Sequence, residues 1–354
     1  MRTQTVVIWS DLAKNLSLYA TGVAPTELTG LLNRTTWGTR DVRYSIKGIA
    51  RILERIKDPH FLLLKKEDSL VGAVVASRKK VRGGDKTYDA LFIAMIAVDP
   101  TMIGLGYGTL LALQAREYGR ALLSEPGIIY LYVETTNTAS VRVHEKIGYR
   151  RIGQYEARIF TRIFPKDNHQ IKRPNDMERV QLADLLERQY AGHELLDVRE
   201  AVQRGRYFVL RCGGEMVAAA QIRPMHWCLK QLRGLGGVMA MTVLPKLPLI
   251  RRGYSPQHLR FIQIGNIWFR PGHETALTGL LEALLARCGV HVGIVFLDRR
   301  SPVHDAIRAN LQFGAFSRLV LETAEVFADL KGWSREETAR LLMGPVNVSP
   351  VDPM

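Results

Sequence analysis

The middle of the chain alternates between apolar runs of strand length and segments whose apolar residues recur every three or four positions. A strand is predicted over residues 87–98, and it ends in Val98-Asp99-Pro100. A turn with three alternating glycines, Gly104, Gly106 and Gly108, follows it. The apolar spacing after these glycines predicts an amphipathic helix over residues 104–123, which Pro126-Gly127 then stops.

A second strand-and-helix pair comes directly afterwards. Residues 128–133, IIYLYV, form another apolar run of strand length. Asn137 and His144 are two helical turns apart, so they share one face of a short helix with Ser140. Gly148 is placed to end that helix.

The remaining periodicity predicts the flanking elements and shows that the chain repeats itself. The first half adds a strand at 3–9, helices at 26–32 and 42–56, a hairpin of 61–65 with 70–77, and closing strands within 151–164. The second half has a helix at 176–190, a hairpin of 207–212 with 215–222, a strand at 259–269, a helix at 275–288, a strand at 290–297 and a helix at 303–311. Pro271 lies 171 residues after Pro100, and Gly314 lies 166 residues after Gly148. Nearly equal offsets indicate an internal duplication.

The length of 354 residues agrees with two domains, at roughly 150 residues per domain. We expect a first domain at 1–164, a polar linker with two prolines at 165–175, a second domain at 176–322, and a helical tail at 323–354. Ser334 and Glu337 have the spacing of a capping box that opens the last helix of this tail.

Composition and charge narrow the class of protein. The formal net charge is +15, which favours anionic ligands and argues against a polycationic one. Because no basic stripe is interleaved with aromatic residues, a solvated basic surface is favoured over a nucleic-acid interface. The three cysteines lack ligand-like spacing, so we expect reduced thiols, no metal site and a cytoplasmic protein. No run approaches the ~20 apolar residues of a membrane span.

The glycine turn has a chemical use at the start of a helix. The first amides of a helix have no partner within it, and glycines let a ligand approach them closely, so such a turn can hold a diphosphate. A tight left-handed turn or close strand–helix packing would also select glycines. A dinucleotide-binding unit would need G-x-G-x-x-G, whereas this turn reads G-x-G-x-G.

Together, the two strand-and-helix pairs over residues 90–153 resemble the GNAT superfamily of acyl-CoA-dependent N-acetyltransferases. Val98-x-Pro100 with the three glycines resembles the family's coenzyme A loop, and Asn137 through Gly148-Tyr149 resembles its second motif. Two residues depart from the family pattern: Ile103 stands where Arg or Gln is usual, and His144 stands where Tyr is usual.

The resemblance implies an α/β (α+β) fold of two tandem GNAT-like domains, each a mixed, mostly antiparallel twisted sheet flanked by helices. It also implies acetyl-CoA as co-substrate without a metal. The implied coenzyme-binding residues are Ile96, Ala97, Val98, Ile103, Gly104, Leu105, Gly106, Tyr107, Gly108, Thr109, Asn137 and Ser140.

By the same resemblance, an amine attacks the acyl carbonyl directly, and the backbone near Val98 stabilises the oxyanion. His144 is the candidate acid that protonates the departing thiolate, with simple packing as the alternative. Glu134 is the candidate general base, with Asp89 as the other nearby carboxylate. Either carboxylate could instead be a solvated residue at a strand end.

The second copy has lost the glycine pattern. Aligning Pro271 on Pro100 puts Thr275 and Leu277 at the first two glycine positions and Glu274 beside them. A carboxylate there would repel a diphosphate by roughly 1 kcal/mol or more. We therefore expect that the second domain binds no coenzyme A, and that it mimics a second subunit or shapes the acceptor pocket.

The second half also contains an apolar insert at 229–259, broken by glycine and proline. We favour a buried loop between the domains, with a lid or a membrane contact as alternatives.

The sequence thus predicts an N-acetyltransferase whose first domain is active. Its acceptor is an amine of a small molecule or a protein. The alternative is a non-catalytic acyl-CoA-binding or interaction module. The chain would be a monomer with pseudo-dimeric domains or a homodimer.

Overall fold

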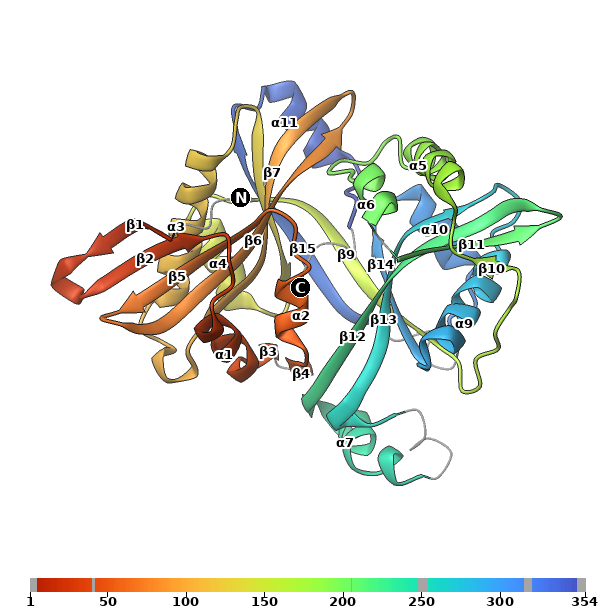
Figure 1. Ribbon diagram of the computed structural model, residues 1–354, viewed down its shortest axis with the longest axis horizontal. Coiled ribbons are helices and arrows are strands. Elements are labelled where there is room, and N and C mark those ends of the chain that lie inside the picture. Colours follow the sequence, from red (N-terminus) through yellow and green to blue (C-terminus); the bar gives the residue numbers. More distant parts are fainter. Residues whose placement is uncertain (1–4, 40–41, 205, 248–253, 315–319, 349–354) are drawn as a thin grey trace.

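The fold is known from a computed structural model that describes residues 5–39, 42–204, 206–247, 254–314 and 320–348. Its centre is one mixed sheet that runs through both halves of the chain (Figure 1), in the order β1-β2-β5-β6-β7-β8-β15-β9-β14-β13-β12-β11-β10. The short strands β3 and β4 extend it beside β12. The predicted α/β class with mixed, mostly antiparallel sheets is confirmed, but the two sheets are joined into one.

The strands have the following bounds. In the first half they are β1 (Val6–Asp11), β2 (Leu16–Thr21), β3 (Trp37–Gly38), β4 (Val42–Ile46), β5 (Pro59–Lys66), β6 (Ser69–Gly83), β7 (Lys86–Val98), β8 (Gly127–Glu134) and β9 (Arg150–Thr161). In the second half they are β10 (Ile171–Lys172), β11 (Arg206–Cys212), β12 (Glu215–Leu232), β13 (Leu259–Phe269), β14 (Val292–Asp298) and β15 (Val320–Lys331).

Helices cover both faces of this sheet (Figure 1). The first half has α1 (Thr26–Arg34), α2 (Ile49–Leu53), α3 (Tyr107–Leu122) and α4 (Thr138–Lys146); the second has α5 (Asp176–Gln189), α6 (Val198–Arg204), α7 (Gly234–Thr242), α9 (Ala276–Cys288), α10 (Pro302–Asn310) and α11 (Arg335–Met343). In the first half, the core around α3 contains Leu62 and Leu64 of β5, whereas the core around α1 and α2 contains Phe61 and Leu63. Because side chains alternate along a strand, the two cores lie on opposite faces of the sheet.

The two halves exchange a strand. β9, which follows α4 of the first half, pairs antiparallel with β14 of the second half. β15, which follows α10, pairs antiparallel with β8 of the first half. β9 and β15 also pair with each other, so this symmetrical crossover joins the two sheets at the centre of the molecule.

An ion-pair cluster fixes the exchanged strand β15 to α3. Asp329 of β15 is buried, and its carboxylate accepts hydrogen bonds from Arg116 Nε at 3.0 Å and Arg120 Nε at 2.6 Å. Each half therefore needs a strand from the other half to complete its sheet. The predicted linker at 165–175 separates two halves of the sequence, but the sheet is continuous across both.

In each half, the two central parallel strands separate before they end. β7 and β8 pair only from Asp89↔Gly127 to Ile93↔Leu131, and β13 and β14 pair only from Ile262↔Gly293 to Ile264↔Val295. Beyond those pairs the strands diverge, which opens a split in the sheet at the carboxyl end of β7 and another at that of β13.

Several local predictions differ from the structure. Residues 42–46 form strand β4, because they pair with β12, and only Ile49–Leu53 of the predicted helix 42–56 is helical. The expected closing strands within 151–164 are the single strand β9, and β2 was not predicted. Part of the expected helical tail is strand β15, whereas the Ser334–Glu337 capping box and the helix α11 after it are present.

The favoured interpretation of the insert as a buried loop is wrong for its described part. β12 runs on to Leu232, and α7 then lies at the outer end of the β12–β13 arm (Figure 1), with no buried side chain. Leu235, Val238 and Met239 of this helix are exposed. Residues 248–253 of the insert lie outside the described residues.

Candidate functional site

The glycine turn is open to its surroundings at the start of α3. Gly104 and Gly106 have φ angles of 89° and 83°, which only glycine adopts readily. A Cβ at either position would meet no atom within 4 Å. Gly106 is the N-cap residue of α3, and no side chain caps this helix. The first amides of α3 therefore face a space that a ligand can enter.

The other predicted residues of the turn have different surroundings. Ile103 is 72% exposed and Leu105 is 60% exposed, so both side chains lie at the rim. A Cβ at Gly108 would lie 3.9 Å from Val98 Cγ2, so this glycine packs α3 on the end of β7. Tyr107 and Thr109 belong to the first turn of α3, and Tyr107 contacts the core beneath it.

The end of β7 offers unpaired backbone at the split. Asp99 N donates to Val71 O at 2.9 Å. Because hydrogen bonding alternates along an antiparallel pair, Ala97 also faces β6, while the amides of Ile96 and Val98 point toward the split. Ile96 and Val98 can therefore hold an extended ligand, whereas Ala97 cannot contribute its amide.

Asn137 and Ser140 lie at the start of α4. Asn137 is the N-cap residue, and its Oδ1 accepts a hydrogen bond from Ser140 N at 3.2 Å. This bond stabilises the helix end that the family resemblance places beside the ligand. The side-chain oxygen of Asn137 is thus already engaged by the protein.

His144 is buried on the same face of the sheet as α3. Its Nδ1 lies 2.8 Å from Ser140 O, and its ring packs against Tyr149 and Phe327. Burial lowers the pKa of His144, and the hydrogen bond to Ser140 O only partly opposes this effect. A neutral His144 that donates from Nδ1 carries a lone pair on Nε2, which cannot protonate a thiolate.

Glu134 lies at the end of β8, on the opposite face from His144. It lines a cavity of about 110 Å³ at the split between β7 and β8. Burial raises the pKa of Glu134, and a hydrogen bond from Thr39 opposes the rise. A carboxylate with a raised pKa is a stronger base, so this position suits proton abstraction.

Aromatic and apolar residues from both halves, together with the amide side chain of Gln263, line the rest of this cavity. They are Trp37, Tyr44, Ile46, Ala94, Met95, Tyr132, Tyr155 and Ala157 of the first half, and Met225, Trp227, Gln263, Ile294 and Phe296 of the second. Sequence reasoning identified none of these as site residues, because they are scattered along the chain and have no shared motif. Only the strand exchange and the pairing of β4 with β12 bring them together.

Asp89, the other carboxylate considered, lies at the opposite end of β7. Its buried side chain accepts hydrogen bonds from Arg78 Nη2 at 2.6 Å and from Ser124 N at 3.2 Å. Burial acts to raise the pKa of Asp89, but these hydrogen bonds and the Arg78 charge outweigh it and lower the pKa to about 2. Asp89 is therefore a structural ion-pair partner away from the split.

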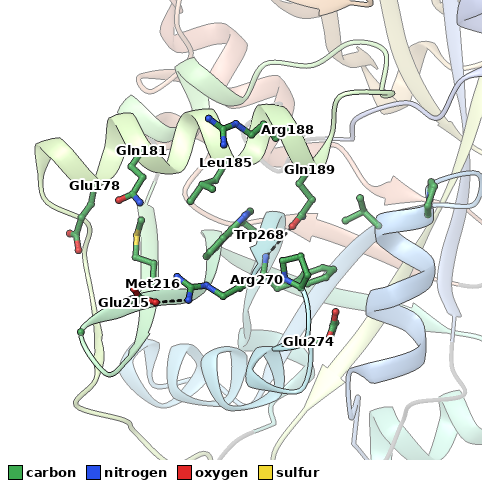
Figure 2. Close-up of a pocket in the computed structure, with 15 residues that line it drawn as sticks. Glu178, Gln181, Leu185, Arg188, Gln189, Glu215, Met216, Trp268, Arg270 and Glu274 are labelled. Atoms are coloured by element: carbon green, nitrogen blue, oxygen red, sulfur yellow. Dashed lines mark hydrogen bonds and ion pairs between the residues drawn. The ribbon is translucent and has the colours of Figure 1, made fainter.

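The second half has a cavity of about 790 Å³ at the end of β13, which is lined by residues of α5 and reaches Pro271 and Glu274, just before the counterpart of the glycine turn. Figure 2 shows how α5 and the ends of β12 and β13 surround it. Its charged residues include Glu215, which pairs with Arg270, and Glu274, which accepts a hydrogen bond from Gly272 N at 3.0 Å.

The side chain of Gln189, the last residue of α5, occupies the backbone edge that would hold an extended ligand in this half. With Pro271 aligned on Pro100, Phe269 and Ile267 correspond to Val98 and Ile96. Gln189 accepts a hydrogen bond from Phe269 N at 3.2 Å, and it donates one to Ile267 O at 2.7 Å. In the second half, Gln189 therefore occupies the strand edge whose counterpart in the first half, at Ile96 and Val98, faces the split.

Among the described residues, no group of His, Cys, Asp and Glu side chains could hold a metal ion. No helix in the described part of the chain has the length and hydropathy to cross a membrane.

Comparisons with known proteins agree with this geometry. Residues 27–149 match the family model described as "Acetyltransferase (GNAT) family". No curated protein matches the sequence. Saccharomyces cerevisiae N-myristoyltransferase with bound myristoyl-CoA is similar in structure, with a TM-score of 0.60 and 9% identity over 94% of this chain and 85% of that one.

Two further structures resemble the chain. A GCN5-related glucosamine N-acetyltransferase region of a fungal multi-domain GH3 β-N-acetylglucosaminidase has a TM-score of 0.51 and 15% identity, over 81% of this chain and 35% of that one. A probable N-acyltransferase from Enterococcus faecalis V583 has a TM-score of 0.51 and 10% identity, over 90% of this chain and 73% of that one. Residues 27–149 of the chain therefore match the GNAT acetyltransferase family, and the chain as a whole has a fold similar to that of N-myristoyltransferase.

Proposed function

We propose that this protein is an acetyl-CoA-dependent N-acyltransferase that uses the split between β7 and β8 as its active site. The main observation behind this proposal is that one split in the sheet adjoins both the open turn at Gly104 and Gly106, here called the glycine cradle, and the cavity that contains the Glu134 carboxylate. The cradle lies on the α3 face, and the cavity lies on the α1 face. Two substrates could therefore meet at the split from opposite sides of the sheet.

The first half has the groups that a coenzyme A ester needs. The amides of Gly104 to Thr109 would hold the diphosphate, and the amides of Ile96 and Val98 would hold the pantetheine arm as an added strand. The ester supplies an activated acyl group. The backbone near Val98 would stabilise the charge that develops on the acyl oxygen.

Glu134 is the general base in this proposal. A primary amine is protonated near neutral pH, so it must lose a proton before it attacks an acyl carbon. The raised pKa of Glu134 helps it to accept that proton, directly or through water. The amine nitrogen then forms a bond to the acyl carbon, and the bond between that carbon and the sulfur breaks. The second proton that the nitrogen loses passes to the departing thiolate, directly or through water, which gives the free thiol.

The surroundings of His144 favour a packing role over the predicted role as the acid. We propose that His144 packs α4 against β15, because it is buried, neutral and bonded to Ser140 O. A thiolate can leave without a protonated partner, so the reaction does not depend on this residue.

In the same proposal, the second half shapes the acceptor cavity and binds no coenzyme A. Five of the residues that line the cavity belong to it, including Trp227 and Phe296. At its own split, the side chain of Gln189 is bonded to the edge that an added strand would use. Glu274 adds a negative charge where a diphosphate would lie.

Calorimetric titration with acetyl-CoA tests the coenzyme site, and we expect one site per chain. A second site would contradict the proposed role of the second half. A parallel titration with myristoyl-CoA tests which acyl group the protein prefers. Tighter binding of myristoyl-CoA than of acetyl-CoA would overturn the proposal that the transferred group is acetyl.

Glu134→Gln tests the catalytic proposal. We expect kcat to fall by about 10²-fold or more, the lower range for general-base catalysis, while the affinity for acetyl-CoA stays unchanged. The matched control is Glu325→Gln on the neighbouring strand β15, where the carboxylate contacts Gln154 instead of the cavity. If acetyl-CoA binds but no amine releases free thiol, the protein is the non-catalytic acyl-CoA-binding module of the alternative hypothesis.

A further inference from the structure

The cavity at Glu134 has a composition that indicates what kind of amine it accepts. Six of the residues that line it carry aromatic rings: Trp37, Tyr44, Tyr132, Tyr155, Trp227 and Phe296. Glu134 is the one acidic or basic residue among the described residues that line it. We propose that the acceptor is a compact primary amine with a single positive charge and an apolar body. This inference rests on the proposed acyltransferase function.

The aromatic walls are held in place by contacts with one another. Tyr44 stacks on Trp227 with ring centroids 3.7 Å apart, and Tyr155 meets Tyr132 and Phe296 edge-on at 5.3 and 5.4 Å. Rings that are fixed before binding lose little conformational entropy when a ligand arrives. Their faces attract an ammonium group through the ring quadrupole, and their carbon atoms pack against an apolar body.

The charge inside the cavity matches one ammonium group. Burial partly desolvates Glu134, which raises its pKa. An ammonium group beside it would favour the charged carboxylate, so the pair would bind as opposite charges and then share the proton that catalysis must move. A polyamine would bring further charges into walls that offer no second carboxylate.

The size of the cavity limits the ligand. Its volume of about 110 Å³ is below the ~150 Å³ of an apolar cavity that takes up benzene. By the same measure, a body of roughly four or five non-hydrogen atoms fits this space.

Steady-state assays of thiol release with three amines test the proposal, together with binding measured by quenching of tryptophan fluorescence. Isoamylamine has one charge and an apolar body, spermidine has several charges, and glucosamine has a polar body. We expect isoamylamine to have a kcat/KM at least tenfold above those of the other two. Equal or higher values for spermidine or glucosamine would overturn the inference and leave the acyltransferase function intact.

A wall variant checks which residues carry the selectivity. Phe296→Leu keeps an apolar side chain but removes the ring, and we expect it to raise the KM for isoamylamine at least threefold with little change in kcat. Phe313→Leu is the matched control, because Phe313 is 4% exposed and Phe296 is 6% exposed, but only Phe296 lines the cavity. An equal effect of both variants would mean that lost packing, not the cavity wall, explains the result.

The binding measurement separates this inference from the proposed function. If isoamylamine quenches the fluorescence and Phe296→Leu weakens that effect, but no thiol is released, the acceptor class holds and the catalytic proposal fails. If thiol is released with another amine and isoamylamine does not bind, the catalytic proposal holds and the acceptor class fails.

Discussion

Replacement of Gly106 by alanine tests the glycine cradle most directly. Gly106 has a φ of 83°, where an L-residue costs about 1–2 kcal/mol. The lower entropy of the unfolded alanine chain returns about 0.4–1 kcal/mol. Since the new Cβ would meet no atom within 4 Å, no clash adds to this cost. We expect the free energy of unfolding to fall by about 1 kcal/mol.

The same methyl group should affect binding far more than stability. It would project into the space where the amides of α3 approach the diphosphate. We expect the affinity for acetyl-CoA to fall at least tenfold, which corresponds to about 1.4 kcal/mol. Calorimetric titration measures the affinity, and urea denaturation measures the stability.

Gly272→Ala is a matched control in the second half. Gly272 has a φ of 82°, and a Cβ there would also meet no atom within 4 Å. The backbone strain is therefore the same, but this turn lies beside the second split. We expect the same loss of stability and less than a twofold change in affinity. Equal affinities of the two variants would refute the assignment of the cradle to Gly106.

Three further outcomes follow from the buried polar groups. Asp329→Ala leaves two arginines of α3 without their buried partner, so urea denaturation should show a loss of about 3 kcal/mol; a loss below about 1 kcal/mol would mean that this cluster does not hold β15. The pKa of Asp89 is about 2 in the folded protein and about 4 in the unfolded chain, so its carboxylate stabilises the fold above pH 4. The free energy of unfolding should therefore fall by about 2 kcal/mol as the pH falls from 4 to 2. Asp89→Asn should lack this slope in acid denaturation, and a wild-type slope in that variant would point to another carboxylate. His144→Phe should keep kcat within about threefold, whereas a loss of 10²-fold would restore the acid role.

The two motifs of the first half were predictable because they depend on short stretches of chain. Alternating glycines at 104–108 start a helix after a buried strand, and the structure has that turn with left-handed angles at Gly104 and Gly106. The tandem GNAT-like fold followed from the same motifs and from the repeated order of elements. Local hydrogen bonds and side-chain periodicity determine such features, so they are visible in one sequence.

Residues 42–46 show where local periodicity fails. Ile46, Ile49 and Ile52 have helical spacing, yet Ile46 is in a strand because it pairs with Trp227, far along the chain. The free energy of that pairing and of the stacked Tyr44 and Trp227 rings outweighs a weak helical preference.

The sequence by itself determined the glycine turn, the duplication and the loss of glycines in the second copy. Only the tertiary structure decided that β9 and β15 exchange places, that Gln189 fills the second split, and that six aromatic rings surround Glu134. Each of these depends on contacts between residues far apart in the chain. Such contacts leave no periodic signal, because their free energy arises only when the strands that carry them pair.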